Sequence, residues 1–411
     1  MKQPLIIIVG FLLLCWPISA EEIPLYKKPW HVLGVFDGEN AELEIISEYN
    51  INQLEQIDSP FAKVVVLFDR TYKHTRDASV RIYDIRPDID RTKITSNSIS
   101  IGERDLGEAD VLDEFLSKYL GDRNILIIKS HGYGIVSPGG LKPGYNSPQD
   151  PLIISGVLHK RLDKPLDAII FGSCNMASVE VAYEFKDLVS VLVASQDLMY
   201  YSFEINDGKT YASRPGIDYI DLIMELKPHS NSIAIGKNVV TSFMDVVSRK
   251  DALYYKATIS ALDLDTLDIT AFKKLADELL KGMTDPETRN HYLAAIGNTL
   301  ENASRFQPIG RNRILAHYDI EDFLRILEDN LNKAVDRPTS IVIQSFSNVY
   351  IEQASGLSIL FFKDLSKVSP VRKKALFETY SKSKFAKETG WDKLMMAYHG
   401  YVTPKNPVDS F

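Results

Sequence analysis

The chain has 411 residues, of which 45% are apolar, and a formal net charge of -8. This acidic balance, without a basic cluster interleaved with aromatic residues, excludes a typical nucleic-acid-binding protein. Of the two cysteines, Cys15 lies in a predicted N-terminal export signal, so we expect Cys174 to be the single cysteine of the mature chain. A single thiol excludes an internal disulfide framework and a thiolate-rich zinc site.

The first 20 residues have the pattern of a signal peptide. Lys2 precedes an apolar run over 5–15, and Ile18-Ser19-Ala20 forms a small-residue cleavage site. The run is shorter than the ~20 residues that span a bilayer. Acylation of Cys15 is the less favoured alternative, because Leu14 stands where a small residue is expected. We therefore expect an exported protein, periplasmic, cell-surface or secreted.

The first half of the mature chain alternates strand-like and helix-like segments. Strands are predicted at 30–36, 64–68, 80–85 and 125–130, and helices at 41–57 and 109–120. Strands that are apolar on both faces and alternate with helices predict an α/β fold, with a mainly parallel sheet sandwiched by helices. In such sheets ligands bind beyond the carboxyl ends of the strands.

Two apolar runs lead into residues that carry chemistry. The strand at 125–130 continues directly into His131, and a second run ends shortly before Cys174. A helix is predicted at 177–185 and a further strand at 191–195. The segment 137–151 is rich in proline and glycine and predicts a loop. We expect His131 and Cys174 to share one edge of the sheet.

After these strands the sequence changes character. Residues 196–216 are polar, aromatic and weakly periodic, and we interpret them as a wall of a substrate pocket. Helices are then predicted at 270–281, 291–299, 320–335 and 391–401, with a late strand at 356–362. We predict an α/β catalytic domain over 21–258 and a mostly helical C-terminal domain over 259–411.

The residue types at the predicted edge fit acyl transfer by a thiol. A cysteine attacks as a thiolate, and its pKa falls near a helix N-terminus. The helical pattern after Cys174 therefore predicts a lowered thiol pKa. His131 is the candidate general acid for a leaving amine. Gly132, without a side chain, lets its N–H approach a developing oxyanion, and the Cys174 N–H is the second candidate donor.

These residues also have structural interpretations. A single cysteine at the end of a buried strand is commonly an inert small apolar residue. The remaining histidines have no metal-binding spacing, so no metal site is predicted. Gly172-Ser173-Cys174-Asn175 is not the nucleophile elbow of a serine hydrolase. From the residues alone, catalysis and inert packing both remain open.

Two motifs resemble those of one peptidase family. Ser130-His131-Gly132-Tyr133-Gly134 and the segment 171–184 look like the clostripain family of clan CD cysteine peptidases, relatives of caspases and gingipains. The likeness continues over nearly all of the mature chain, in ordered blocks at 51–54, 66–69, 105–110, 193–195, 259–264, 318–323, 356–359 and 391–392.

The resemblance implies a caspase-like fold and hydrolysis of peptide bonds through a thioester acyl-enzyme. Cys174 would be the nucleophile and His131 the general acid and base. The family commonly prefers arginine or lysine before the cleaved bond and usually has an aspartate two positions ahead of the cysteine. Gly172 takes that place here, which removes the usual partner of a buried cation.

Seven residues are candidates for the substrate pocket. They are Gly172, Ser173, Ser195, Gln196, Asp197, Glu204 and Asp207. If none of the three acids supplies a carboxylate, we expect the pocket to accept a neutral or apolar side chain.

Many family members mature by cutting a loop between the histidine and cysteine strands, which corresponds here to 137–151. Its one basic residue, Lys142, precedes Pro143, an unfavourable bond for an endopeptidase. We expect a protein that is active unprocessed or is cut elsewhere. Calcium is associated with the family, but the sequence has no EF-hand loop or dense carboxylate cluster, and cysteine chemistry requires no cofactor.

Two other functions share these residues. One is a secreted binding or scaffold protein on a degraded peptidase fold, which Gly172 favours. The other is an acyltransferase or transpeptidase with the same Cys174 and His131 pair. For the favoured endopeptidase the expected partners are peptide or protein substrates, without nucleic acid and without a stable membrane span.

Overall fold

The computed structural model describes most of the chain after the predicted signal peptide. The described residues are 28–38, 41–70, 79–136, 150–199, 202–206, 209–214, 216–248, 256–306, 314–348, 351, 353–366 and 368–402. The predicted signal peptide, Cys15, Lys142 and Asp207 lie outside them, as does the Glu204 side chain.

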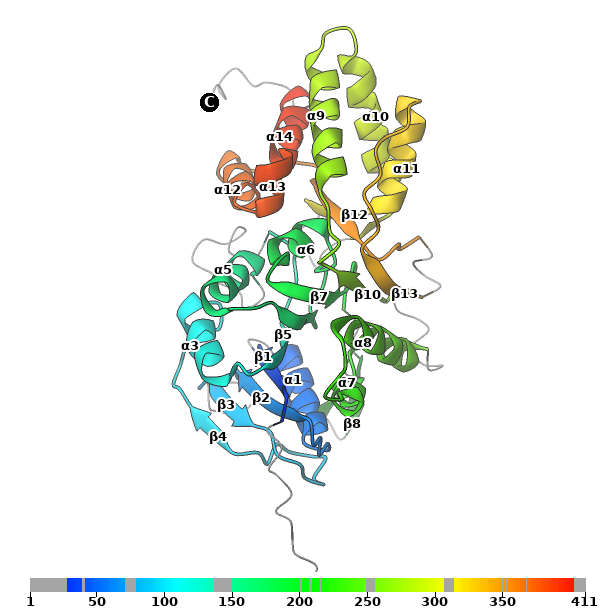
Figure 1. Cartoon of the computed structure of the whole chain (residues 1–411). Coiled ribbons are helices and arrows are strands. Elements are labelled where there is room, and N and C mark those ends of the chain that lie inside the picture. Colours follow the sequence, from blue (N-terminus) through cyan, green and yellow to red (C-terminus); the bar gives the residue numbers. More distant parts are fainter. Residues whose placement is uncertain are drawn as a thin grey trace, which may run out of the picture.

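A nine-stranded sheet forms the centre of the molecule, in the order β13-β10-β7-β6-β5-β1-β2-β3-β4 (Figure 1). Five adjacent strands are parallel: β7 (Val189–Ala194), β6 (Leu166–Phe171), β5 (Arg123–Lys129), β1 (Trp30–Phe36) and β2 (Ala62–Phe68). Antiparallel strands complete both edges: β10 (Thr258–Asp263) and β13 (Val342–Ser347), and β3 (Arg81–Asp84) and β4 (Ser98–Ser100). The mainly parallel α/β fold predicted from the sequence is confirmed.

Helices cover both faces of this sheet because alternate strand residues point to opposite sides. Leu33 and Leu126 belong to an apolar cluster with α3 (Ala109–Tyr119), α5 (Pro151–Arg161) and α6 (Val179–Phe185). Val32 and Ile125, their neighbours in sequence, pack with α1 (Ala41–Leu54), α7 (Tyr219–Glu225) and α8 (Ser232–Val247). A hairpin of β8 (Ser202–Asn206) and β9 (Lys209–Arg214) precedes α7.

The rest of the chain is mostly helical and lies in the upper part of Figure 1. Its helices are α9 (Thr270–Thr284), α10 (Arg289–Asn302), α11 (Ile320–Leu331), α12 (Pro370–Tyr380), α13 (Lys384–Thr389) and α14 (Trp391–Val402). A three-stranded sheet lies among them, in the order β11 (Arg305–Phe306), β12 (Leu315–Asp319), β14 (Ser358–Phe362). We call β11, β12 and β14 the small sheet.

The predicted boundary between 258 and 259 falls at the start of β10. This strand pairs with β7 and β13, so the central sheet continues past the boundary. Phe185 of α6 and Trp391 of α14 also belong to one continuous apolar cluster. The division into two domains remains a prediction.

Helix α5 starts inside the predicted loop 137–151, so the loop prediction is wrong at its last residue. Pro151 occupies the first helical turn, and the Asp150 side chain accepts a hydrogen bond from the Leu152 N–H. Proline is favourable there because the first N–H groups of a helix have no partner within the helix.

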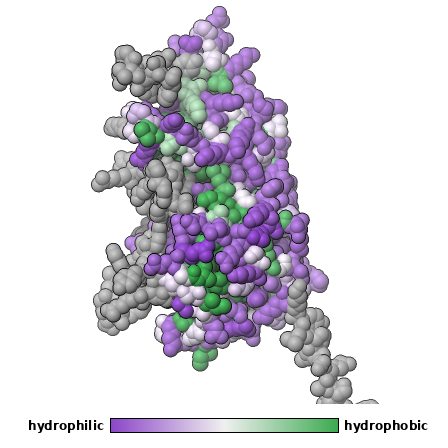
Figure 2. Space-filling view, turned by 90° about the vertical axis from the view of Figure 1, so that its left-hand side faces the viewer, coloured by the Kyte–Doolittle hydropathy of each residue, from purple (hydrophilic) through white to green (hydrophobic). Residues whose placement is uncertain are grey.

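Within the described residues, none of the helices is long and apolar enough to cross a membrane. The face seen in Figure 2 is mainly hydrophilic. In the described part of the chain, the large exposed apolar side chains are Ile89, Ile99, Met224, Val371 and Met396.

Candidate active site

His131 and Cys174 follow the carboxyl ends of two neighbouring parallel strands. Ile128 of β5 pairs with Phe171 of β6, and each candidate residue lies three positions beyond its member of this pair. His131 is half-buried, and Cys174 is buried with 5% of its surface exposed. The structure therefore brings both residues to the same edge of the sheet, as the sequence predicted.

The loops after these strands pack backbone against backbone. A Cβ atom at Gly132 would lie 1.9 Å from the Cys174 carbonyl oxygen and 2.5 Å from the Cys174 nitrogen. Real Cβ atoms do not approach other atoms so closely, so only glycine fits at this position. The absence of a side chain at 132 thus lets the histidine loop lie directly on the cysteine.

The Cys174 thiol is in a closed state. Burial raises the pKa of Cys174 to about 11, and the nearby Asp197 carboxylate acts in the same direction. The backbone N–H of Met199 donates to Sγ at 3.1 Å, and hydrogen bonds from the Gly132 and Cys174 backbones also favour the thiolate. At neutral pH the thiol is therefore protonated and covered.

The predicted lowering of the thiol pKa is wrong for this state. Helix α6 begins at Val179, five residues after Cys174, and is only seven residues long. The helix dipole acts mainly within the first turn, so desolvation of the thiol dominates.

Asn175 shapes the turn after the cysteine and was not predicted as a site residue. Its φ of 57° is left-handed, a conformation that asparagine tolerates better than most residues. Its side-chain amide donates to the Gln196 carbonyl at 2.8 Å, and its backbone N–H donates to the Asp197 carbonyl at 3.0 Å. Asn175 thereby joins the cysteine loop to the segment that covers the thiol.

Three of the predicted pocket residues are fully buried and hold loops together. Ser173 Oγ accepts from the Ser130 N–H, and Ser195 Oγ lies 2.8 Å from Thr258 Oγ1. The Gln196 amide donates to Asp319 Oδ2 at 3.1 Å and accepts from the Gly356 N–H at 2.7 Å.

Gly172 lies over a lysine and a tyrosine. A Cβ at this position would be 3.0 Å from the Tyr219 hydroxyl and 3.5 Å from Lys129 Cγ. Lys129 is fully buried and its Nζ donates to Asn50 Oδ1. Burial lowers the pKa of this ammonium well below its ordinary value.

Among the three predicted pocket acids, Asp197 has a described side chain and is 6% exposed. Burial raises its pKa, while a hydrogen bond from the Leu198 N–H and the Lys256 charge lower it. Glu204 belongs to β8, where only the backbone is described.

An aspartate directly follows each of the next two strands of the sheet, β1 and β2. The sequence analysis did not predict these two aspartates as site residues. Asp37, after β1, accepts a hydrogen bond from Ser130 Oγ at 2.6 Å. Asp69, after β2, has its pKa raised to about 7 by burial and then by repulsion from Asp37. Their positions directly after apolar strands were the available signal.

The small sheet is hydrogen-bonded to the cysteine loop and to α6. Ser358 of β14 donates from its backbone N–H and its hydroxyl to the Ala177 carbonyl, at 3.0 and 2.9 Å. The Leu360 N–H donates to Glu180 Oε1 of α6 at 2.8 Å.

Within the described residues, no three His, Cys, Asp or Glu side chains are arranged to hold a metal ion.

A histidine and a cysteine at adjacent strand ends, with backbone N–H groups around the sulfur, suit acyl transfer by a thiol. The sequence pattern of the clostripain family matches residues 38–398. The chain belongs to the clostripain family. No curated protein matches the chain.

Solved structures of clostripain-type proteases share the fold at low sequence identity. An inactive zymogen of a C11 protease from Parabacteroides distasonis is 17% identical, with a TM-score of 0.57 over 88% of this chain and 98% of that chain. A secreted C11 cysteine protease from Bacteroides thetaiotaomicron, bound to an irreversible peptide inhibitor, is 15% identical, with a TM-score of 0.54 over 88% and 99%.

Proposed function

We propose that this clostripain-family protein is an exported cysteine endopeptidase whose nucleophile is Cys174 and whose general acid and base is His131. The observation that carries the proposal is the matched position of the two residues, each three places beyond a paired position of β5 and β6. The contact of Gly132 with the Cys174 backbone adds to it, because this contact brings the Gly132 N–H to the Cys174 thiol.

In the proposed reaction the Cys174 thiolate attacks the scissile carbonyl carbon. The N–H groups of Gly132 and Cys174 stabilise the resulting oxyanion. His131, protonated when the thiol ionises, gives its proton to the leaving amine, and a thioester remains on Cys174. His131 then takes a proton from water, and the resulting hydroxide attacks the thioester carbonyl. The C–S bond breaks, which releases the acid product and returns the Cys174 thiolate. The proposed chemistry uses no metal ion, and calcium has no assigned role.

The closed thiol implies an opening step before catalysis. A substrate carbonyl needs to reach Sγ, which the Met199 backbone now covers. We infer that the segment 196–199 moves when a peptide binds or when the chain is cut. Opening would also readmit water to the thiol and lower its pKa, since burial is the largest cause of the raised value.

For specificity, we propose that residue 172 does not select arginine or lysine. The position offers no carboxylate, and the nearest side chains are those of Tyr219 and Lys129. A cation placed beside the Lys129 amine would gain no countercharge from it. A neutral or apolar side chain before the scissile bond fits this surface better, unless Asp197, Glu204 or Asp207 supplies an acid.

We do not expect the protein to mature by cutting itself after Lys142 within 137–151, because Pro143 follows this lysine. The intact mass of purified wild-type protein, beside that of Cys174→Ala, tests this expectation. Equal single-chain masses agree with it. A wild-type protein cut within 137–151 while Cys174→Ala stays intact would overturn it.

A catalytically inactive binding or scaffold protein is the second candidate, favoured by the buried, protonated thiol and by Gly172. The deciding experiment incubates the mature protein with a peptide library under reducing conditions, beside Cys174→Ala and His131→Ala. We expect cleavage by the wild type and a loss of at least about 1000-fold in both variants. Cleavage that survives in both variants would refute the dyad, and a wild type that cuts nothing would favour the scaffold.

A further inference from the structure

His317 lies directly beneath the loop that carries His131. It is the middle residue of β12, fully buried, and pairs with Leu360 of β14 and Phe306 of β11. Gly134, three residues after His131, has a φ of 68°. A Cβ at Gly134 would lie 2.3 Å from His317 Cε1 and 3.3 Å from the Asn175 carbonyl oxygen. The imidazole, the histidine loop and the cysteine turn therefore meet at one point.

Apolar packing alone does not explain why a histidine, with two polar ring nitrogens, is buried at this position. Neither ring nitrogen has a hydrogen-bond partner at normal geometry among the described residues. Burial lowers the pKa of His317 to about 4, whereas the nearby Tyr133 carbonyl acts in the opposite direction. The neutral ring is thus packed beneath Gly134 and near the Tyr133 carbonyl, and in the closed state it makes no hydrogen bond of normal geometry to the described residues. An apolar side chain of similar size would avoid the cost of this desolvated polar ring.

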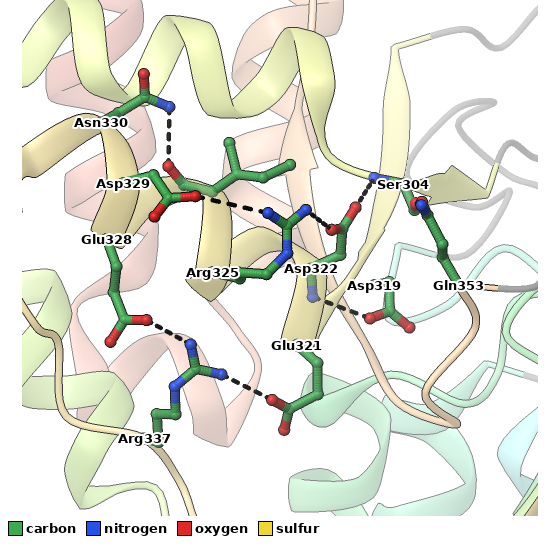
Figure 3. Close-up of polar contacts among 11 residues, drawn as sticks. Ser304, Asp319, Glu321, Asp322, Arg325, Glu328, Asp329, Asn330, Arg337 and Gln353 are labelled. Atoms are coloured by element: carbon green, nitrogen blue, oxygen red, sulfur yellow. Dashed lines mark hydrogen bonds and ion pairs between the residues drawn. The ribbon is translucent and has the colours of Figure 1, made fainter.

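The strand that carries His317 is firmly anchored at its end. Asp319 accepts a hydrogen bond from the Asp322 N–H at the start of α11 (Figure 3). It also accepts from the Ser355 N–H and hydroxyl. Asp319 also accepts from Gln196 in the segment over the thiol. Arg325 binds Asp322, which in turn accepts from the Ser304 N–H. A ring fixed in this way can resist displacement of the loop above it.

We propose that His317 is a positioning residue: its ring packs beneath Gly134, and in the open site its N–H pairs with the Tyr133 carbonyl, which fixes the orientation of His131 and Gly132 toward Cys174. The inference rests on the proposed peptidase function. His317 itself touches neither substrate nor scissile bond. It links the small sheet to the histidine loop, as Ser358 links that sheet to the cysteine loop.

The test compares His317→Leu, which removes the ring N–H, with His317→Gln, which keeps a side-chain N–H donor. Tyr318→Phe is the matched control, since its hydroxyl donates to the Leu300 carbonyl, away from the histidine loop. For a cleaved peptide we expect His317→Leu to lower kcat roughly tenfold to hundredfold, with KM changed less than about threefold. His317→Gln should recover most of the loss, and Tyr318→Phe should keep the wild-type kcat.

Alkylation of Cys174 by iodoacetamide across pH gives a readout that needs no peptidase activity. His317→Leu should shift the midpoint of the alkylation profile, while His317→Gln and Tyr318→Phe stay at the wild-type value. An unchanged profile or a wild-type kcat in folded His317→Leu overturns the proposal. Equal losses in kcat and melting temperature for all three variants also overturn it. If the wild type cuts no peptide but His317→Leu still shifts the alkylation midpoint, the result counts against the proposed function only.

Discussion

At the residue scale, the site depends on backbone approach as much as on the dyad. Gly132 has no room for a side chain against the Cys174 carbonyl, and Gly134 has none against His317. Sequence reasoning identified Gly132 for its small size, but its tight contact with the cysteine backbone required the structure. Asn175 and His317 were missed, because neither residue type is distinctive without the neighbours that the fold supplies.

Gly132→Ala should therefore damage the site. The added Cβ would force the histidine loop away from Cys174, and we expect peptide cleavage to fall at least about 100-fold, with a lower melting temperature. Gly156→Ala is the control, since this exposed glycine of α5 has nothing within 4 Å of an added Cβ. Alanine there should raise stability slightly, by about 0.5–1 kcal/mol. Wild-type activity in Gly132→Ala would contradict the described approach.

At the element scale, apolar runs predicted the parallel strands well because these strands are buried on both faces. Strand β1 was predicted with its observed bounds, and the order of β5, His131, β6 and Cys174 followed from the same pattern. The contacts of the segment after β7 were harder to predict from the sequence. Gln196 resembles a pocket residue in sequence, yet its partners lie 123 and 160 residues away, where no local pattern reveals them.

Gln196→Ala should loosen the segment over the thiol. It removes both side-chain hydrogen bonds and leaves Asp319 and the Gly356 N–H less satisfied, at a cost of roughly 1–3 kcal/mol. Since the raised pKa of Cys174 comes mainly from burial, greater exposure should increase iodoacetamide alkylation several-fold at pH 8. Gln344→Ala is the control: this half-buried residue of β13 donates to Thr241 Oγ1 and not to the segment over the thiol, so the rate should stay unchanged. Slower or equal alkylation in Gln196→Ala would show that this segment does not protect the thiol.

At the scale of the whole molecule, the two predicted domains share contacts that sequence patterns did not reveal. The small sheet binds the cysteine loop through Ser358, and β10 extends the central sheet beyond residue 258. The shift to helical periodicity near 259 was a true feature of the sequence, since α9 to α14 follow it. Periodicity reports local structure, however, and not which elements pack together.

Glu180 joins these regions and should make stability depend on pH. It is fully buried in α6 and accepts from the Leu360 N–H and the Tyr380 hydroxyl. Burial raises its pKa to about 7, above the ordinary 4.5. Its stabilising contribution is therefore fully present below about pH 4.5 and is lost as pH rises through about 7, by up to roughly 3 kcal/mol.

Glu180→Gln should thus raise the melting temperature by a few degrees at pH 8 and change it little at pH 5. Thermal unfolding at the two pH values measures the difference, with exposed Glu108→Gln as the control. An equal effect of Glu180→Gln at both pH values would mean that the carboxyl does not titrate in this range.

The central claim is that Cys174 forms a thioester with the acyl half of a cleaved peptide. Its most direct test mixes the reduced protein with a cleaved peptide, quenches in acid before turnover is complete, and maps the adduct by mass spectrometry. We predict an added acyl mass on the peptide that contains Cys174, and none in Cys174→Ala. Cleavage with the adduct on another residue, or with the same adduct in Cys174→Ala, would contradict the account.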